Sequence, residues 1–145
     1  MRVRTDRISS VRPRKKLARS TLLALAVCAC GGAITTPSPG ETFRLHLGES
    51  ARVEGTSLVV TFWAVLEDTR CPVDVVCILA GNGRVRLEVR GVPGAGHLVL
   101  NTTGEPRESP VGGFRIRLHD LLPDRLVGRP IPPEAYEVDL EVVPN

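Results

Sequence analysis

Aromatic residues are scarce in this chain of 145 residues, which has three phenylalanines, one tryptophan and one tyrosine. Five aromatic side chains are too few to build a platform on which successive nucleic-acid bases stack. Long apolar runs are absent as well: no stretch reaches the roughly 18 apolar residues that a permanent transmembrane helix needs. The hydrophobic fraction of 42% is nevertheless too high for a wholly disordered chain.

Charge is distributed unevenly along the sequence. The chain has 19 Lys and Arg residues against 16 Asp and Glu residues, a formal net charge of +3. Residues 1–29 contain eight of the basic residues and one of the acidic ones. The remaining 11 basic and 15 acidic residues therefore give residues 30–145 a net charge of −4. A surface that neutralises phosphates is basic, so we do not expect this larger part of the chain to bind nucleic acid.

Residues 1–29 have the pattern of a secretory signal peptide. A basic segment ends at Arg19, and about nine apolar residues and then small residues follow it. Nine helical residues would cover roughly 14 Å, about half of the hydrocarbon core of a bilayer, so this segment cannot span one. The sequence therefore predicts export.

The end of this segment, Val-Cys-Ala-Cys-Gly-Gly at residues 27–32, resembles the lipobox of bacterial lipoproteins. Such proteins are cut directly before the cysteine that receives the lipid. Ala29 fits the small position before the cut, so we predict Cys30 as the lipidated residue. Cys28 would require a cut after the bulkier Val27. The alternative is an ordinary secretory signal with incidental cysteines.

Residues 30–41 are rich in Gly, Thr, Ser and Pro and offer almost nothing to bury. This composition is typical of a flexible tether that holds a domain away from a membrane surface. The expected organisation is a lipoprotein-type signal peptide over 1–29, a tether over 30–41 and one folded domain over 42–145.

Alternation of apolar and polar residues dominates that domain. In residues 84–90, Val85, Leu87 and Val89 share one face while the charged residues share the other, and residues 43–47, 114–119 and 136–142 repeat the scheme. This period is typical of strands buried on one face of an antiparallel sheet. Residues 58–66 are apolar on both faces and are the best candidate for a central strand.

Glycine-rich and proline-rich segments separate these runs, and Asn82-Gly83 predicts a tight hairpin. Seven or eight short strands without a helical period predict an all-β fold, an antiparallel β-sandwich, with a small β-barrel as the alternative.

Two cysteines, Cys71 and Cys77, lie within the domain. In an oxidising compartment such a close pair is normally bridged, and we predict a structural disulfide between them. A redox catalyst usually has the spacing C-x-x-C, and a zinc site would need further ligands that no nearby histidine supplies.

Residues 68–82 around this pair read Asp-x-Arg-Cys-Pro-x4-Cys-x2-Ala-Gly-Asn. The string resembles a motif, D-[ST]-R-C-P-x4-C-x-[WL]-A-G, of small bacterial exported proteins and lipoproteins of unknown function. Those proteins usually have Ser where this chain has Thr69, and Trp where it has Leu79. The resemblance covers fifteen residues and implies an exported, lipoprotein-like setting without implying an activity.

Catalytic motifs are absent from the sequence: there is no Gly-x-Ser-x-Gly, no His-Glu-x-x-His and no phosphate-binding glycine loop. The three histidines, His46, His97 and His119, follow no ligand spacing. We therefore predict no enzyme activity, no cofactor and no metal site. The alternative is a small envelope enzyme or metal-handling protein that uses these histidines and the acids near the disulfide.

The favoured hypothesis is a non-catalytic lipoprotein of the bacterial cell envelope, a binding or structural module with an envelope protein as partner. Its predicted recognition surface is the loop that contains Asp68, Arg70 and Asn82. Arg70 is the strongest candidate, because a planar guanidinium suits bidentate contacts and Arg is enriched in interface hot spots. The competing hypothesis is that Arg70 only packs across the loop and pairs with Asp68.

Overall fold

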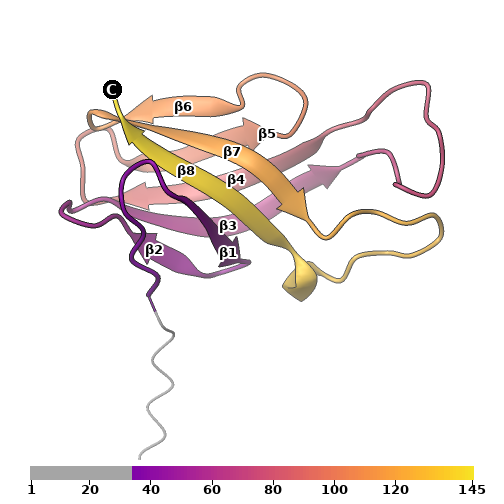
Figure 1. The fold of residues 1–145 in the computed structure, drawn as a ribbon, viewed down its shortest axis with the longest axis horizontal. Helices are drawn as coiled ribbons and strands as arrows, with labels where there is room; N and C mark the ends of the chain where they lie inside the picture. Colours follow the sequence, from indigo (N-terminus) through magenta and orange to yellow (C-terminus); the bar gives the residue numbers. More distant parts are fainter. Residues whose placement is uncertain (1–33) are drawn as a thin grey trace, which may run out of the picture. The chain divides into compact units, whose positions relative to one another are not determined.

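Two antiparallel four-stranded sheets make up residues 34–145, the part of the chain that the computed structural model describes (Figure 1). One sheet has the strand order β1-β8-β7-β6 and the other the order β2-β3-β4-β5, and the two do not close into a barrel. The predicted β-sandwich is confirmed. The predicted signal peptide and Cys30 lie outside the described residues. The elements are β1 (Thr42–His46), β2 (Ser50–Arg52), β3 (Val59–Asp68), β4 (Gly83–Arg90), β5 (Gly96–Asn101), β6 (Glu108–Val111), β7 (Phe114–Leu122), a short 3-10 helix η1 (Pro133–Ala135) and β8 (Glu137–Pro144).

The core lies between the two sheets and follows from the alternation in the sequence. In β4, the side chains of Val85, Leu87 and Val89 are buried while the charged residues between them, Arg86 and Glu88, face outward. Apolar side chains removed from water in this way are the main stabilising contribution to a sandwich. The same alternation in β1, β7 and β8 buries Phe43, Leu45, Ile116, Leu118, Val138, Leu140 and Val142.

β3 is a central strand, as the sequence predicts, but only one of its apolar faces is covered. Val60 and Phe62 lie in the core, whereas Trp63 and Leu66 are 53% and 39% exposed on the outer face. The second apolar face of this strand is therefore a surface feature and not part of the core.

Two β-bulges explain the position of these exposed residues. The pairing of β3 with β4 skips Trp63 and Leu66, which have no direct partner. Each bulge adds a residue to the outer face. Val65 and Asp68 consequently pair with two buried residues of β4 and face the inner side.

Residues 34–41, the described part of the predicted tether, are paired with the domain. Thr35 forms a parallel bridge with Ala51 of β2, and the Gly40 N–H donates to the carbonyl of Val142 in β8 over 2.7 Å. Pro37 is buried. The composition of this segment predicts few buried side chains. Its backbone N–H and C=O groups nevertheless form hydrogen bonds with β2 and β8, because backbone pairing does not depend on the side chain, and these bonds hold the segment on the domain.

The β3–β4 loop (residues 69–82) and the β7–β8 connection (residues 123–136) lie side by side at one end of the molecule, on the right in Figure 1. The Val73 N–H donates to the carbonyl of Arg125 over 3.0 Å. The tight hairpin predicted at Asn82-Gly83 is wrong, because the whole fourteen-residue loop joins β3 to β4. None of the described residues forms a helix with the length and apolarity needed to cross a bilayer.

Candidate functional site

The two arms of the β3–β4 loop are paired at its base. The Thr69 N–H donates to the carbonyl of Asn82, and the Cys71 N–H donates to that of Ala80, both over 2.8 Å. Gly81 has a φ of +67°, and a Cβ there would lie 1.8 Å from the Thr69 carbonyl oxygen. Only glycine permits both this conformation and this approach. The loop therefore leaves the sheet on a closed stem.

A disulfide between Cys71 and Cys77, whose Cα atoms are 6.0 Å apart, closes the outer part of the loop. The predicted bridge is confirmed. It restricts the conformations available to residues 72–76 in the unfolded chain, which stabilises the folded loop.

Arg70 reaches from the loop into the body of the domain. Its Nε and Nη2 donate to the two carboxylate oxygens of Asp68, each over 2.8 Å. Nη2 also donates to the carbonyl of Pro123 over 2.9 Å, and Nη1 donates to the carbonyl of Leu121. These four bonds occupy most of the five N–H donors of a guanidinium. The side chain is 13% exposed, so little of it is available to a partner.

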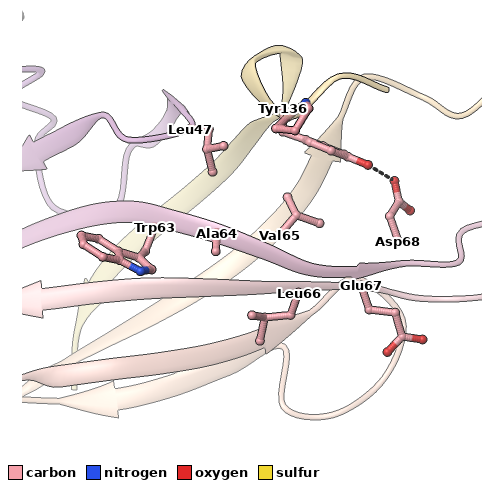
Figure 2. A pocket seen from close by; sticks show the side chains of 9 residues that line it. Leu47, Trp63, Ala64, Val65, Leu66, Glu67, Asp68 and Tyr136 are labelled. Carbon is pink, nitrogen blue, oxygen red and sulfur yellow. Dashed lines mark hydrogen bonds between the residues drawn. The ribbon is translucent and has the colours of Figure 1, made fainter. Parts of the chain in front are cut away.

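Asp68 and Tyr136 complete this cluster, because the Tyr136 hydroxyl donates to Asp68 Oδ2 over 3.0 Å (Figure 2). Burial by itself would raise the pKa of Asp68, but the hydrogen bonds and positive charge of Arg70, helped by Tyr136, hold this pKa below its ordinary value. Burial and the negative charge of Asp68 raise the pKa of Tyr136. The cluster thus holds an ionised carboxylate between a guanidinium and a neutral phenol.

Asn82 fastens the other arm of the loop. Its Nδ2 donates to Asn101 Oδ1 over 2.8 Å, and its Oδ1 accepts from the backbone N–H of Thr103 over 3.2 Å. This side chain ties the end of the loop to the β5–β6 turn.

The structure brings Asp68 and Arg70 together and places Asn82 on the opposite arm of the loop. All three side chains are bonded to the domain beneath the loop. This geometry supports the competing hypothesis for Arg70, in which it braces the loop.

The outer part of the loop presents aliphatic side chains instead. Val76 and Ile78 are fully exposed, and exposed Val127 of the β7–β8 connection is tied to the same loop, because its N–H donates to the carboxylate of Asp74 over 3.0 Å. Clusters of exposed apolar side chains mark interaction sites. We call the following six residues the apolar tip: Val73, Val75, Val76, Ile78, Leu79 and Val127.

The sequence interpretation did not single out the apolar tip, although a signal was present. Residues 73–79 read Val-Asp-Val-Val-Cys-Ile-Leu, an apolar run without turn-forming Gly or Pro, inside a connection between two strands. Apolar residues in a strand alternate so that one face can be buried, but this run in a loop has no such alternation. Its apolar side chains are therefore expected to be exposed.

A groove of about 510 Å³ runs along β3 near the base of the loop, lined among others by Leu47, Trp63, Val65 and Tyr136. It exists because β2 is short and pairs with β3 only at Val59–Thr61, which leaves the rest of this strand edge without a neighbouring strand. Figure 2 shows Val65 pointing toward Tyr136 and Leu66 pointing to the opposite side of β3.

The three histidines lie apart, and none contacts Asp68. Among residues 34–145, no group of three or more His, Cys, Asp or Glu residues is arranged to hold a metal ion. Each histidine has its own neighbour: His46 Nδ1 lies 3.2 Å from Glu137 Oε1, His119 Nε2 lies 2.9 Å from Glu141 Oε2, and the ring of His97 lies 6.2 Å from that of Trp63.

Comparisons of the chain with protein-family models, with curated proteins and with solved structures gave no match.

Proposed function

We propose that this protein is an exported, lipid-anchored binding module of the bacterial cell envelope that recognises a partner protein through its apolar tip, without catalysis. The observation that carries this proposal is a loop whose polar side chains brace it from below while its exposed side chains are aliphatic.

Preorganisation is the physical reason for assigning recognition to this loop. A flexible loop loses conformational entropy when a partner orders it, and that cost weakens binding. Here the disulfide, the backbone pairs of the stem and the bonds of Arg70 order the loop before any partner arrives. Asp74 adds a link to the β7–β8 connection. The apolar tip is therefore held in one shape.

The chemistry of the apolar tip favours a protein pocket over an anionic bilayer. Within residues 68–82 the only charged residues are Asp68, Arg70 and Asp74, so the loop has a net charge of −1. Contact with an anionic membrane is favoured by Lys and Arg near the inserting side chains. Valine, isoleucine and leucine side chains of this size fit an apolar pocket lined by similar groups.

The proposed setting rests on the sequence. The basic segment, the apolar segment and Cys30 occur in the order found in lipoprotein signals. The resemblance of residues 68–82 to exported proteins and lipoproteins supports the same setting. No contact in residues 34–145 specifically favours the enzyme or metal-handling alternative.

A photo-crosslinking amino acid placed at Ile78 tests the proposal in cells that make the full chain. We expect a discrete protein adduct, because this side chain is fully exposed within the apolar tip. The additional substitution Leu79→Ser should weaken the adduct, since it removes an apolar side chain next to the crosslinker. The matched control carries the crosslinker at Ala95, an exposed residue of the β4–β5 turn, and should give no such adduct.

Stability measurements distinguish lost binding from lost folding. Because Leu79 is exposed, Leu79→Ser should change the free energy of unfolding by no more than about 0.5 kcal/mol. Identical adducts from Ile78 and Ala95, or adducts with lipid alone at Ile78, would contradict the proposal.

A further inference from the structure

The outer face of the sheet β2-β3-β4-β5 combines arginines with exposed apolar side chains. We call it the basic face. Glu67 and Glu88 are its acidic residues, and they are paired with Arg84 at 3.4 Å and with Arg90 at 2.9 Å. Its solvent-facing basic and apolar residues are Arg52, Arg84, Arg86, Arg90, Val59, Trp63, Ala64, Leu66 and Val99.

Four arginines against two glutamates give the basic face a net charge of +2, within residues 30–145 that carry −4 overall. Among residues 34–145, Arg52 and Arg86 have no acidic group within 4.0 Å. Their charges are therefore available to an external anion.

The outer face of the other sheet has the opposite character. Its arginines are engaged: Arg44 lies 2.7 Å from Asp139, and Arg117 lies 2.7 Å from Glu108. Its three arginines are outnumbered, giving a net charge of −2, because five acids share this face: Glu108, Asp120, Glu137, Asp139 and Glu141. The domain is thus polarised between its two sheets.

The N-terminal part of the chain joins the domain at the edge of the sheet that bears the basic face. Thr35 is bridged to Ala51, and β2 is the edge strand of that sheet. Two strand spacings separate Thr35 from Val60 of β3, because Ala51 of β2 lies between them. Trp63 is three residues further along β3, which puts it roughly 14 Å from Thr35. The five residues from Cys30 to Thr35 reach at most about 17 Å. A lipid on Cys30 would therefore keep this edge of the sheet within about 17 Å of the bilayer.

We propose that the basic face lies on an anionic lipid bilayer beside the lipid anchor. The part concerning the anchor rests on the proposed function. Tryptophan is enriched at membrane–water interfaces, where its apolar ring and polar N–H are both accommodated. Arginine side chains near a negatively charged leaflet are attracted to it. Trp63 and Leu66 enter the interface while Arg52 and Arg86 bind lipid phosphates.

Trp63 is the only tryptophan of the chain, so its fluorescence reports on the basic face alone. The lipidated protein is reconstituted into vesicles of phosphatidylethanolamine and phosphatidylglycerol with brominated acyl chains. We expect about twofold or stronger quenching relative to unbrominated vesicles, because an interfacial indole contacts the chains. The control, Trp63→Phe combined with His119→Trp, places the indole on the opposite face and should be quenched little. Equal quenching of the two proteins, or none of Trp63, would overturn the proposal.

A second measurement does not depend on the anchor. The mature chain, residues 30–145 with Cys30→Ser, is mixed with phosphatidylglycerol vesicles and with phosphatidylcholine vesicles, because the basic residues of the signal peptide would themselves bind anionic lipid. We expect binding to the anionic vesicles only, weakened at least about tenfold by Arg52→Glu with Arg86→Glu, since arginines supply the attraction. Arg107→Glu, a charge reversal at an exposed residue away from this face, should leave the affinity within about twofold. Equal binding by the Arg52/Arg86 variant and the parent would overturn the proposal.

The two proposals fail separately. If mass spectrometry finds no acyl group on Cys30, the proposed anchoring is wrong, and the vesicle measurement with Cys30→Ser still decides whether the basic face binds lipid.

Discussion

Arg70 shows how a side chain suited to recognition becomes part of the scaffold. The guanidinium bonds to a carboxylate on one side and to the carbonyls of Leu121 and Pro123 on the other. It therefore links the β3–β4 loop to the end of β7. A charged pair with this little exposure is stabilising only while both partners remain.

Replacing Arg70 with alanine should lower the free energy of unfolding by about 2–3 kcal/mol, because hydrogen bonds to charged groups are lost and Asp68 is left without its main partner. Chemical denaturation of the two proteins measures this. Arg84→Ala is the matched control, since Arg84 pairs with Glu67 on the exposed surface at 3.4 Å and should cost under about 1 kcal/mol. Equal effects of the two substitutions would contradict the bracing role.

The ionisation of Asp68 should make stability depend on pH. The pKa of this carboxyl is lower in the folded protein than in the unfolded chain, so its stabilising contribution is complete above the unfolded value of about 3.9. That contribution is lost as the pH falls through the folded pKa. The difference in unfolding free energy between the parent and Asp68→Asn should therefore shrink as the pH drops below about 4. A difference that stays constant down to acid denaturation would contradict this assignment.

At the scale of elements, the β3–β4 loop is stabilised by a covalent link at its outer part and by hydrogen bonds at its stem. The disulfide restrains the outer part of the loop, and the hydrogen bonds restrain the part next to the strands. Breaking the outer link should loosen the apolar tip while the stem keeps the strands in register.

The double variant Cys71→Ser with Cys77→Ser should lower the free energy of unfolding by up to about 2.4 kcal/mol, the chain-entropy contribution of closing about seven residues. The slope of the denaturation curve should change little, because the folded core is the same. Denaturant titration measures both quantities. Two thiols that react freely with an alkylating reagent in protein isolated without reductant would contradict the bridge.

β3 shows a further effect at this scale. A straight strand would turn Ala64 and Leu66 toward the core, but two bulges turn Val65 inward and leave Leu66 outside. The bulges lie beyond Thr61, which pairs with Ser50, the first residue of β2, so they coincide with the unpaired edge that forms the groove. They also place Trp63 and Leu66 on the basic face.

At the scale of the whole molecule, the outer faces of the two sheets carry opposite net charge. The proposed lipid anchor would turn the positively charged face toward the bilayer. Cys30 is predicted to be the first residue of the mature protein. Mass spectrometry of the membrane fraction should find a chain that begins there and carries added acyl mass. Cys30→Ser should move most of the protein out of the tightly bound membrane fraction, since a few arginines and one indole bind a bilayer far more weakly than attached acyl chains. A product with a free N-terminus beyond Cys30 would contradict this prediction.

The sequence by itself determined the all-β class, the positions of β1, β3, β4, β7 and β8, and the disulfide. Alternation such as that of Val85, Leu87 and Val89 is a local property, because a strand presents every second side chain to the same face. The two cysteines are the only ones in residues 42–145 and lie six positions apart, so each has only the other as a partner within the domain.

Only the tertiary structure decided which way the polar residues of the loop point and which apolar residues stay exposed. Arg70 turns inward because carbonyls from Leu121 and Pro123, some fifty positions away, lie within its reach. Thr35 is held because its backbone meets β2. Trp63 is exposed because no element within residues 34–145 covers that side of the sheet. Each outcome depends on contacts between segments that are distant in sequence, and the alternation of apolar and polar residues within one segment does not predict such contacts.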